Sequence, residues 1–198
     1  EYQTSGTAEF ELDYSVEYES NQMTVVDEYK YDTNTNQFTY SNIGIREFLE
    51  VDVDGSIYTA YSSYQNKNHV FKLEKGADEA SVFLSANAND IFIDDNKNIY
   101  IVDQYNHSVK KYAAGSTTGV VVAGGNGYGN NSNQLNSPRG VYVDSAGNVY
   151  VADSDNHRVQ KWEPDATAGI TVAGGNGTSD VCNNLSQLYY PKKVYVDK

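Results

Sequence analysis

The sequence predicts an all-β fold, a β-propeller made of four-stranded antiparallel blades. Two stretches of the chain, residues 91–127 and 141–177, align without a gap and share 16 of 37 residues. Each stretch holds four short runs of β-forming residues, separated by clusters of Gly, Asn, Asp and Ser that favour turns. Four strands in a unit that repeats about every 50 residues are typical of a propeller blade.

The second unit shows the expected strands most clearly. They are residues 141–143, 149–151, 158–162 and 170–173, and a Gly-rich turn follows at residues 174–177. The run 158–162 alternates polar and apolar side chains, as a half-buried strand does. Weaker runs at residues 8–18, 23–31 and 38–40 predict three more strands near the N-terminus.

Both units contain the motif Asp-x-x-Asn-His-x-Val, which starts at Asp103 and again at Asp153. On these residues the sequence resembles the NHL-repeat family, with Ser108 and Arg158 in the place of the family's Leu. The resemblance is strong from residue 91 to the C-terminus and weak over residues 50–73. It implies a propeller, in this family more often one of about six blades. It also extends to amidating lyases and lactonases that hold a metal in the central channel, although the ligands they require are not visible here.

We expect one domain, residues 1–198, of about four blades. Three strands near the N-terminus and one near the C-terminus could complete a blade and close the ring, which would hide the edges of the sheets. The alternative is a fragment of a larger propeller, whose terminal strands could pair between chains and form fibres. The expected divisions are an acidic divergent blade at 1–48, a degenerate repeat at 49–90, clear NHL-like repeats at 91–140 and 141–190, and a closing or truncated strand at 191–198.

Charge and composition argue against several classes of function. The net charge is −13, and residues 1–48 alone carry ten acidic side chains against two basic ones. Nucleic-acid binding is therefore disfavoured, since it depends on neutralising phosphates with Lys and Arg. No apolar run is long enough to span a bilayer. Cys182 is the only cysteine, so no internal disulfide can form.

Four N-glycosylation acceptors lie in expected loops, where a glycan would be tolerated in a secreted glycoprotein. This placement favours an extracellular location. The acceptors are Asn106, Asn130, Asn176 and Asn184.

Chain direction places the loop between the second and third strands of a blade at the same end as the loop to the next blade. This loop-rich face is the predicted binding surface, because loops on a rigid scaffold concentrate binding residues. It is rich in Asn, Ser, Tyr and Gly, a composition that suits hydrogen bonding and stacking with a glycan or a protein ligand. The candidate binding residues are Gln104, Tyr105, Asn106, His107, Tyr128, Asp155, Asn156, His157 and Arg158.

Metal binding is weighed against a structural role at two kinds of place. His69, His107 and His157 recur once per unit, which could bring imidazoles together but fits a tight strand connection better. Residues 52–56 and 94–96 faintly resemble calcium loops, without the full ligand spacing. We therefore predict no catalytic residue, no metal site and no cofactor.

The sequence favours a non-enzymatic, extracellular binding or interaction module. Eighteen Tyr residues support this interpretation, because tyrosine supplies a large contact area at low entropic cost. One alternative is a structural subunit that assembles with copies of itself, as a homo-oligomer or filament, through its terminal strands. The other is a metal-dependent propeller enzyme of the lyase or lactonase type.

Overall fold

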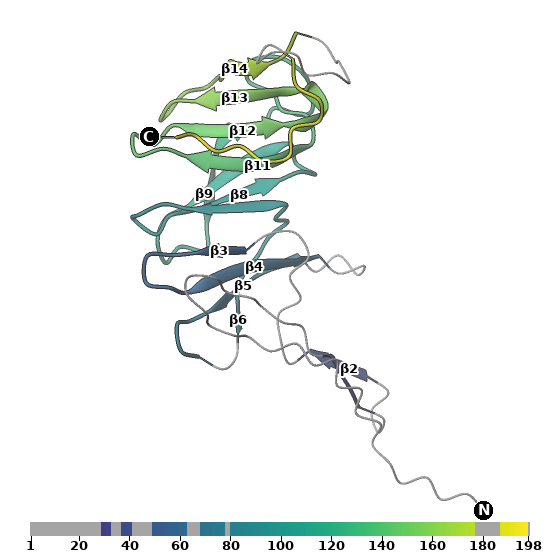
Figure 1. Ribbon diagram of the computed structural model, residues 1–198, viewed down its shortest axis with the longest axis vertical. Helices are drawn as coiled ribbons and strands as arrows, with labels where there is room; N and C mark the ends of the chain where they lie inside the picture. The colour runs from purple at the N-terminus through teal and green to yellow at the C-terminus, as the bar shows by residue number, and fades with distance from the viewer. Residues whose placement is uncertain are drawn as a thin grey trace, which may run out of the picture.

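A computed structural model describes residues 29–32, 37–40, 49–62, 68–77, 80–176 and 187–197. Three four-stranded antiparallel sheets are stacked along the long axis of the molecule, as expected for propeller blades (Figure 1). Blade I contains β3 (Leu49–Val51), β4 (Ile57–Ser62), β5 (Asn68–Leu73) and β6 (Ser81–Ser85). Blade II contains β7 (Asp90–Ile93), β8 (Ile99–Asp103), β9 (Ser108–Tyr112) and β10 (Gly119–Gly124). Blade III contains β11 (Pro138–Val143), β12 (Val149–Asp153), β13 (Arg158–Trp162) and β14 (Ile170–Gly174).

The other described elements are short. A separate hairpin pairs β1 (Tyr29–Asp32) with β2 (Gln37–Tyr40), in partial agreement with the strands expected at 23–31 and 38–40. The strand expected at 8–18 lies outside the described residues. A single turn of 3₁₀ helix, η1 (Ser154–Asn156), joins β12 to β13. Within the described ranges, no helix has the length and hydropathy needed to cross a membrane.

The hydrophobic core lies between the blades. One cluster fills the space between blades I and II and includes Tyr58, Val70 and Ile101. The other fills the space between blades II and III and includes Leu135 and Trp162. Apolar side chains on both faces of a blade are thus buried by its neighbours, which explains why β8 is buried along its whole length. The strand β11 packs against β7 and β8, and β3 packs against β7.

The hairpin between the first and second strands has the same design in all three blades. In blade III, Asp144 Oδ1 accepts hydrogen bonds from the backbone N–H groups of Ala146, at 3.0 Å, and of Asn148, at 2.8 Å. The Tyr150 hydroxyl donates to Asp144 Oδ2 at 3.2 Å. Matching bonds link Tyr58 to Asp52 and Tyr100 to Asp94 in blades I and II. The loops that resemble calcium sites are therefore turns closed by their own carboxylates.

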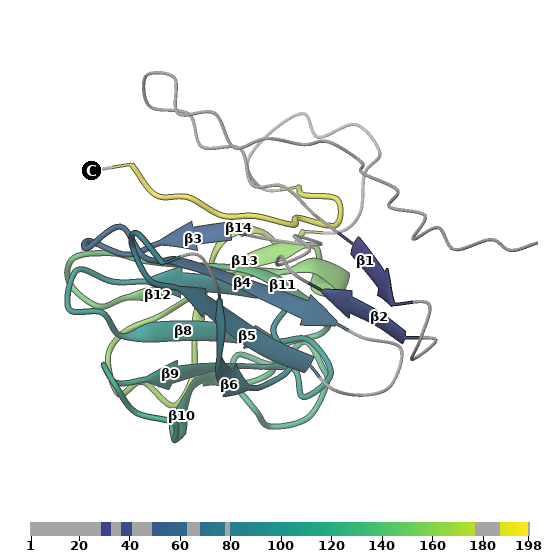
Figure 2. The same ribbon diagram turned by 90° about the horizontal axis from the view of Figure 1, so that it is seen from below.

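Residues 187–197 form no strand, although 191–198 was expected to be one. They lie beside β11, where the first strand of a further blade would lie, and run along the same side of the molecule as β3 (Figure 2). Two contacts show the equivalence. Tyr195 packs on Tyr142 with ring centroids 5.0 Å apart, and Tyr142 packs in the same way on Phe92, at 5.1 Å. The second contact, at the two histidines, is described below.

Candidate functional site

The loop face is formed by residues 104–107, 125–137, 154–157 and 187–190, at one end of blades II and III. Contacts between these loops show that they meet. The Asn156 side-chain amide donates to the carbonyl oxygen of Gly129 at 2.8 Å, and the Asp155 N–H donates to that of Asn136 at 3.2 Å. The sequence argument from chain direction therefore brings these distant loops together correctly.

Arg158 fastens the long loop 125–137 to blade III. Its guanidinium Nη atoms donate to the carbonyl oxygens of Asn130, Asn131 and Gln134 at 2.9, 3.1 and 3.0 Å. Its Nε donates to Asp153 Oδ2 at 2.7 Å. The Arg158 residue is only 7% exposed, so this side chain positions the loop and has little surface left for a ligand.

Asp153 is the buried centre of this arrangement. Its carboxylate accepts bonds from Arg158, from the Asn156 side chain at 2.8 Å and from the Asn136 N–H at 2.7 Å. Burial raises the pKa of Asp153, and these three donors oppose that rise. Because Asp153 is 0% exposed, the network acts as a rigid internal support for the loop.

His107 and His157 each connect a turn to the next blade. Both have a left-handed backbone, with φ of 51° and 54°. The Nδ1 atom of His107 accepts the N–H of Ser137 at 3.1 Å, and that of His157 accepts the N–H of Tyr190 at 3.2 Å. Each bond holds the residue just before the proline that starts the next unit. These two histidines therefore have the structural role that the sequence favoured.

His69 does not match the other two, contrary to the sequence alignment. In the sheet, Leu73 lies opposite Ile57 as Tyr112 lies opposite Ile99. This register puts His69 at the position of Ser108 and Arg158, one residue after the place of His107 and His157. Its Nδ1 lies 3.1 Å from the Ser85 hydroxyl. Among the described residues, no three His, Cys, Asp or Glu side chains converge on a possible metal site.

Exposed tyrosine rings pack against both of these histidines. Tyr128, which is 74% exposed, lies 5.9 Å from the His107 ring. Tyr189, which is 50% exposed, is stacked on His157 at 5.6 Å, and Tyr190 meets the same imidazole edge-on at 4.4 Å. Tyr105 is also on this face and is 77% exposed. Tyr189 and Tyr190 were not among the sequence candidates, although their place just before Pro191 in the repeat could have indicated them.

The remaining candidates differ in how free their side chains are. Gln104 is partly buried, and Asp155 is exposed. The Asn106 amide nitrogen donates to the buried Asp103 at 2.7 Å, so a glycan on that atom would replace a structural bond. Asn130 and Asn176 are exposed, which suits glycosylation, and Asn184 lies outside the described residues.

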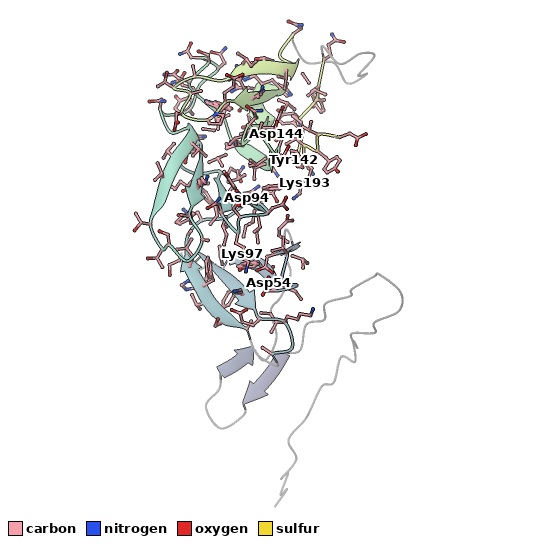
Figure 3. The ribbon with its side chains drawn as sticks, turned by 90° about the vertical axis from the view of Figure 1, so that its left-hand side faces the viewer. Asp54, Asp94, Lys97, Tyr142, Asp144 and Lys193 are labelled. Carbon is pink, nitrogen blue, oxygen red and sulfur yellow. The ribbon has the colours of Figure 1, made fainter. Side chains whose placement is uncertain are left out.

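One group of charges around the buried Asp90 carboxylate was missed by the sequence analysis. Lys193 forms an ion pair with Asp90, whose other carboxylate oxygen accepts the Val141 N–H at 3.0 Å. Burial, and then the nearby charge of Asp90, raise the pKa of Glu50 to about 7. Figure 3 shows Lys193 next to Tyr142, and it shows Lys97 next to Asp54, with which Lys97 forms an ion pair between blades I and II. No motif in the sequence signals these pairs, because their members come from parts of the chain that are far apart in the sequence.

The sequence profile of the NHL repeat matches residues 135–162. This stretch begins at the buried Leu135, includes η1 and ends with β13, so it covers most of blade III. The chain therefore carries an NHL repeat, as the Asn-His motif indicated. A comparison with curated proteins gave no significant match.

Among the solved structures that this chain resembles, two illustrate the shared fold. A crystal structure of an auxiliary nutrient binding protein from Bacteroides thetaiotaomicron VPI-5482 is 19% identical, with a TM-score of 0.57 over 83% of this chain and 46% of that one. A crystal structure of a nidogen/laminin complex is also 19% identical, with a TM-score of 0.54 over 81% of this chain and 57% of that one. This chain thus spans about half the length of the proteins that it resembles. A piece of a larger propeller is consistent with that span.

Proposed function

We propose that this chain, an array of propeller blades that carries an NHL repeat, is a non-enzymatic binding module whose ligand contacts the loop face. The observation that carries the proposal is the set of exposed tyrosine rings on this face. Tyr105, Tyr128 and Tyr189 leave half or more of their surface in solvent, although each is a large and partly apolar side chain. Exposed aromatic groups of this kind provide contact area for a partner.

The support beneath these rings strengthens the proposal. The loops are fixed by Arg158 and Asp153 and by the two histidines, so the tyrosines are presented by a preorganised surface. Preorganisation lowers the entropic cost of binding. One of the two proteins of similar fold has been described as nutrient binding, and the other forms part of a nidogen/laminin complex. Both descriptions are compatible with a propeller that recognises a ligand.

We further propose that the protein works outside the cell. The exposed Asn130 lies in an acceptor sequence on the loop face, where a glycan could be attached without disturbing a strand. Expression through a secretory pathway, followed by mass spectrometry of the peptide around Asn130, tests this. An unmodified Asn130 in secreted protein would remove this support.

Binding to the loop face can be tested with tyrosine variants. The full chain would be screened against peptide and oligosaccharide libraries, and the double variant Tyr105→Ala/Tyr128→Ala would be compared with it. We expect the double variant to lose affinity by tenfold or more, roughly the value of one or two aromatic contacts. Tyr195→Ala is the matched control, because Tyr195 is 75% exposed but lies outside the loop face. If both variants bind equally well, the loop face is not the binding surface.

Self-assembly remains a second candidate, and one observation favours it. Val51 in blade I is 45% exposed, whereas the equivalent Ile93 and Val143 in blades II and III are 9% and 4% exposed. The face that each later blade buries against its predecessor is thus open in blade I, where another chain could pack. Sedimentation over a range of concentrations tests this, with Val51→Asp as the variant. Assembly that Val51→Asp prevents would support it, and a monomer at every concentration would exclude it.

A further inference from the structure

Each of the two histidine turns carries an exposed tyrosine ring, which we call its aromatic platform; the ring planes are tilted by 55° at His107 and stacked at 22° at His157. The first platform is the Tyr128 ring on His107, in blade II, and the second is the Tyr189 ring on His157, in blade III. Both histidines occupy the same place in their blades and hold the same kind of backbone bond. The two platforms therefore lie on neighbouring blades at the same end of the molecule.

The tyrosines come from different places in their loops. Tyr189 and Tyr190 directly precede Pro191, and the equivalent residues before Pro138 are Asn136 and Ser137. Tyr128 instead stands near the start of its loop, after Gly127. The packing of the repeat thus requires no tyrosine at either place, yet each loop lays an exposed phenol ring on its histidine. A role in contacting a ligand accounts for exposed rings at two unrelated places in the loops.

The surroundings of the platforms are polar but almost uncharged. Residues 125–137 contain no acidic or basic side chain, although the whole chain has a net charge of −13. Within the described part of the loop face, Asp155 is the only exposed charged side chain, since the charge of Arg158 is buried against Asp153. The exposed polar groups are mostly amides and hydroxyls, which can both donate and accept hydrogen bonds.

These features together select one class of ligand. An aromatic ring has a negative face, which attracts the polarised C–H groups of an apolar sugar face. Amides and hydroxyls around the ring match the hydroxyls of a sugar. Among the described residues of the loop face, an anionic polymer would find no exposed positive charge, and a basic peptide would find only the single carboxylate of Asp155. Resting on the proposed function of the loop face, we infer that its ligand is an uncharged polysaccharide whose sugar rings stack on Tyr128 and Tyr189.

Two platforms on adjacent blades also predict a dependence on chain length. A polysaccharide long enough to reach both platforms gains from the second contact without a second loss of translational freedom. A mono- or disaccharide would occupy one platform at a time. Affinity should therefore rise with the number of sugar units and then level off.

Affinity electrophoresis of the full chain in gels that contain a soluble polysaccharide tests the inference. The neutral probes are β-glucan, galactomannan, xylan and starch, and the anionic probes are pectin and alginate. We expect at least one neutral probe to retard the protein, independently of salt concentration. Tyr128→Ala and Tyr189→Ala should each weaken binding by about tenfold, and the double variant should abolish it. Tyr128→Trp should keep binding, because it keeps an aromatic face, and Tyr195→Ala should have no effect.

Two outcomes would overturn the inference. If no neutral probe binds but a peptide or an anionic probe does, and Tyr128→Ala weakens that binding, the loop face is a binding surface for another class of ligand and the proposed function stands. If a neutral probe binds equally well to the Tyr128→Ala/Tyr189→Ala variant, the platforms do not hold the sugar. Far-ultraviolet circular dichroism and urea unfolding of each variant confirm that it is folded, which these exposed positions should allow.

Discussion

Residues at equivalent positions of two blades have very different structural roles in this chain. The first residue of the third strand is Ser108 in blade II and Arg158 in blade III. Arg158 makes four hydrogen bonds, whereas the buried Ser108 hydroxyl finds no hydrogen-bond partner among the described residues. The difference follows from what the arginine must hold: the long loop 125–137 precedes blade III, while only residues 86–89 separate β6 from β7. The arginine is thus matched to a loop that blade II does not have.

Replacing Arg158 by Met should strongly destabilise the protein. The substitution keeps much of the apolar stem but leaves the Asp153 carboxylate buried without its cation and frees three loop carbonyls. Breaking a buried ion pair by removing one partner costs about 3–5 kcal/mol. Urea unfolding, followed by tryptophan fluorescence of the buried Trp162, measures the change in the free energy of unfolding.

The matched control is Lys161→Met on the same strand. Lys161 pairs with Glu163 at 3.5 Å, and the Glu163 side chain is 69% exposed. Such a surface pair contributes about 0–1 kcal/mol. A loss of comparable size in both variants would show that Arg158 does not have the structural role assigned to it.

At the scale of the strand, the repeat made most of the fold predictable. The strand expected at 158–162 is β13 to the residue, and the expected turn at Asp144 is closed by that carboxylate. These predictions succeed because local chemistry determines them: alternation of side chains sets a strand, and an Asp followed by Gly and Asn sets a turn. Placing Arg158 among the binding residues was less successful, because burial depends on a loop more than twenty residues away in the sequence.

Register was harder to predict than the existence of strands. The Asn-His pair at residues 68–69 looks like the pair at 106–107, but cross-strand pairing shifts it by one position. The apolar pattern determines the register of β5, since Val70 must lie on the buried face as Val109 does. A shift of one residue would turn every side chain of β5 to the wrong face. Burial therefore sets the register of this strand, and the similarity of the Asn-His pairs does not.

The absence of a side chain at Gly140 allows the C-terminal segment to approach β11. A Cβ atom at this position would lie 2.9 Å from the Lys193 Cα atom and still closer to the Lys192 carbonyl oxygen. Gly140→Ala should therefore push residues 187–197 away from blade III. We expect trypsin to cleave after Lys192 and Lys193 about tenfold faster, because cleavage follows the population of the open form. Mass spectrometry of the products over time gives both rates.

Ser145→Ala, in an exposed turn of the same blade, is the control for this experiment. It should be cleaved at the rate of the parent protein. Equal cleavage of the Gly140→Ala variant and the parent would mean that the segment does not need the close approach seen at Gly140.

At the scale of the whole molecule, charges from three separate parts of the chain meet on one side. Glu50 belongs to β3, Asp90 to β7, and Lys193 to the C-terminal segment. The Lys193 ammonium group pairs with Asp90 and favours the ionised form of Glu50 as a nearby charge, and Asp90 is 1% exposed. Burial raises the pKa of Asp90, although Lys193 opposes the rise. Full ionisation of this group is therefore unfavourable, and its protonation should couple the packing of the blades to pH.

Glu50 gives this coupling a defined pH window. Its ordinary pKa is 4.5 and its pKa in the folded protein is about 7, so the folded state holds a proton that the unfolded chain releases. The contribution of Glu50 to the free energy of unfolding is therefore complete below about pH 4.5, falls as the pH rises to about 7, and is constant above that. Glu50→Gln should remove this fall, so the stability of the variant relative to the parent should increase between about pH 4.5 and pH 7 and stay constant above that. Urea unfolding at steps of pH measures the difference.

The control is Glu163→Gln, at an exposed site, whose stability should follow that of the parent throughout. A constant difference in stability between the Glu50→Gln variant and the parent would show that the pKa of Glu50 is not raised in the folded protein.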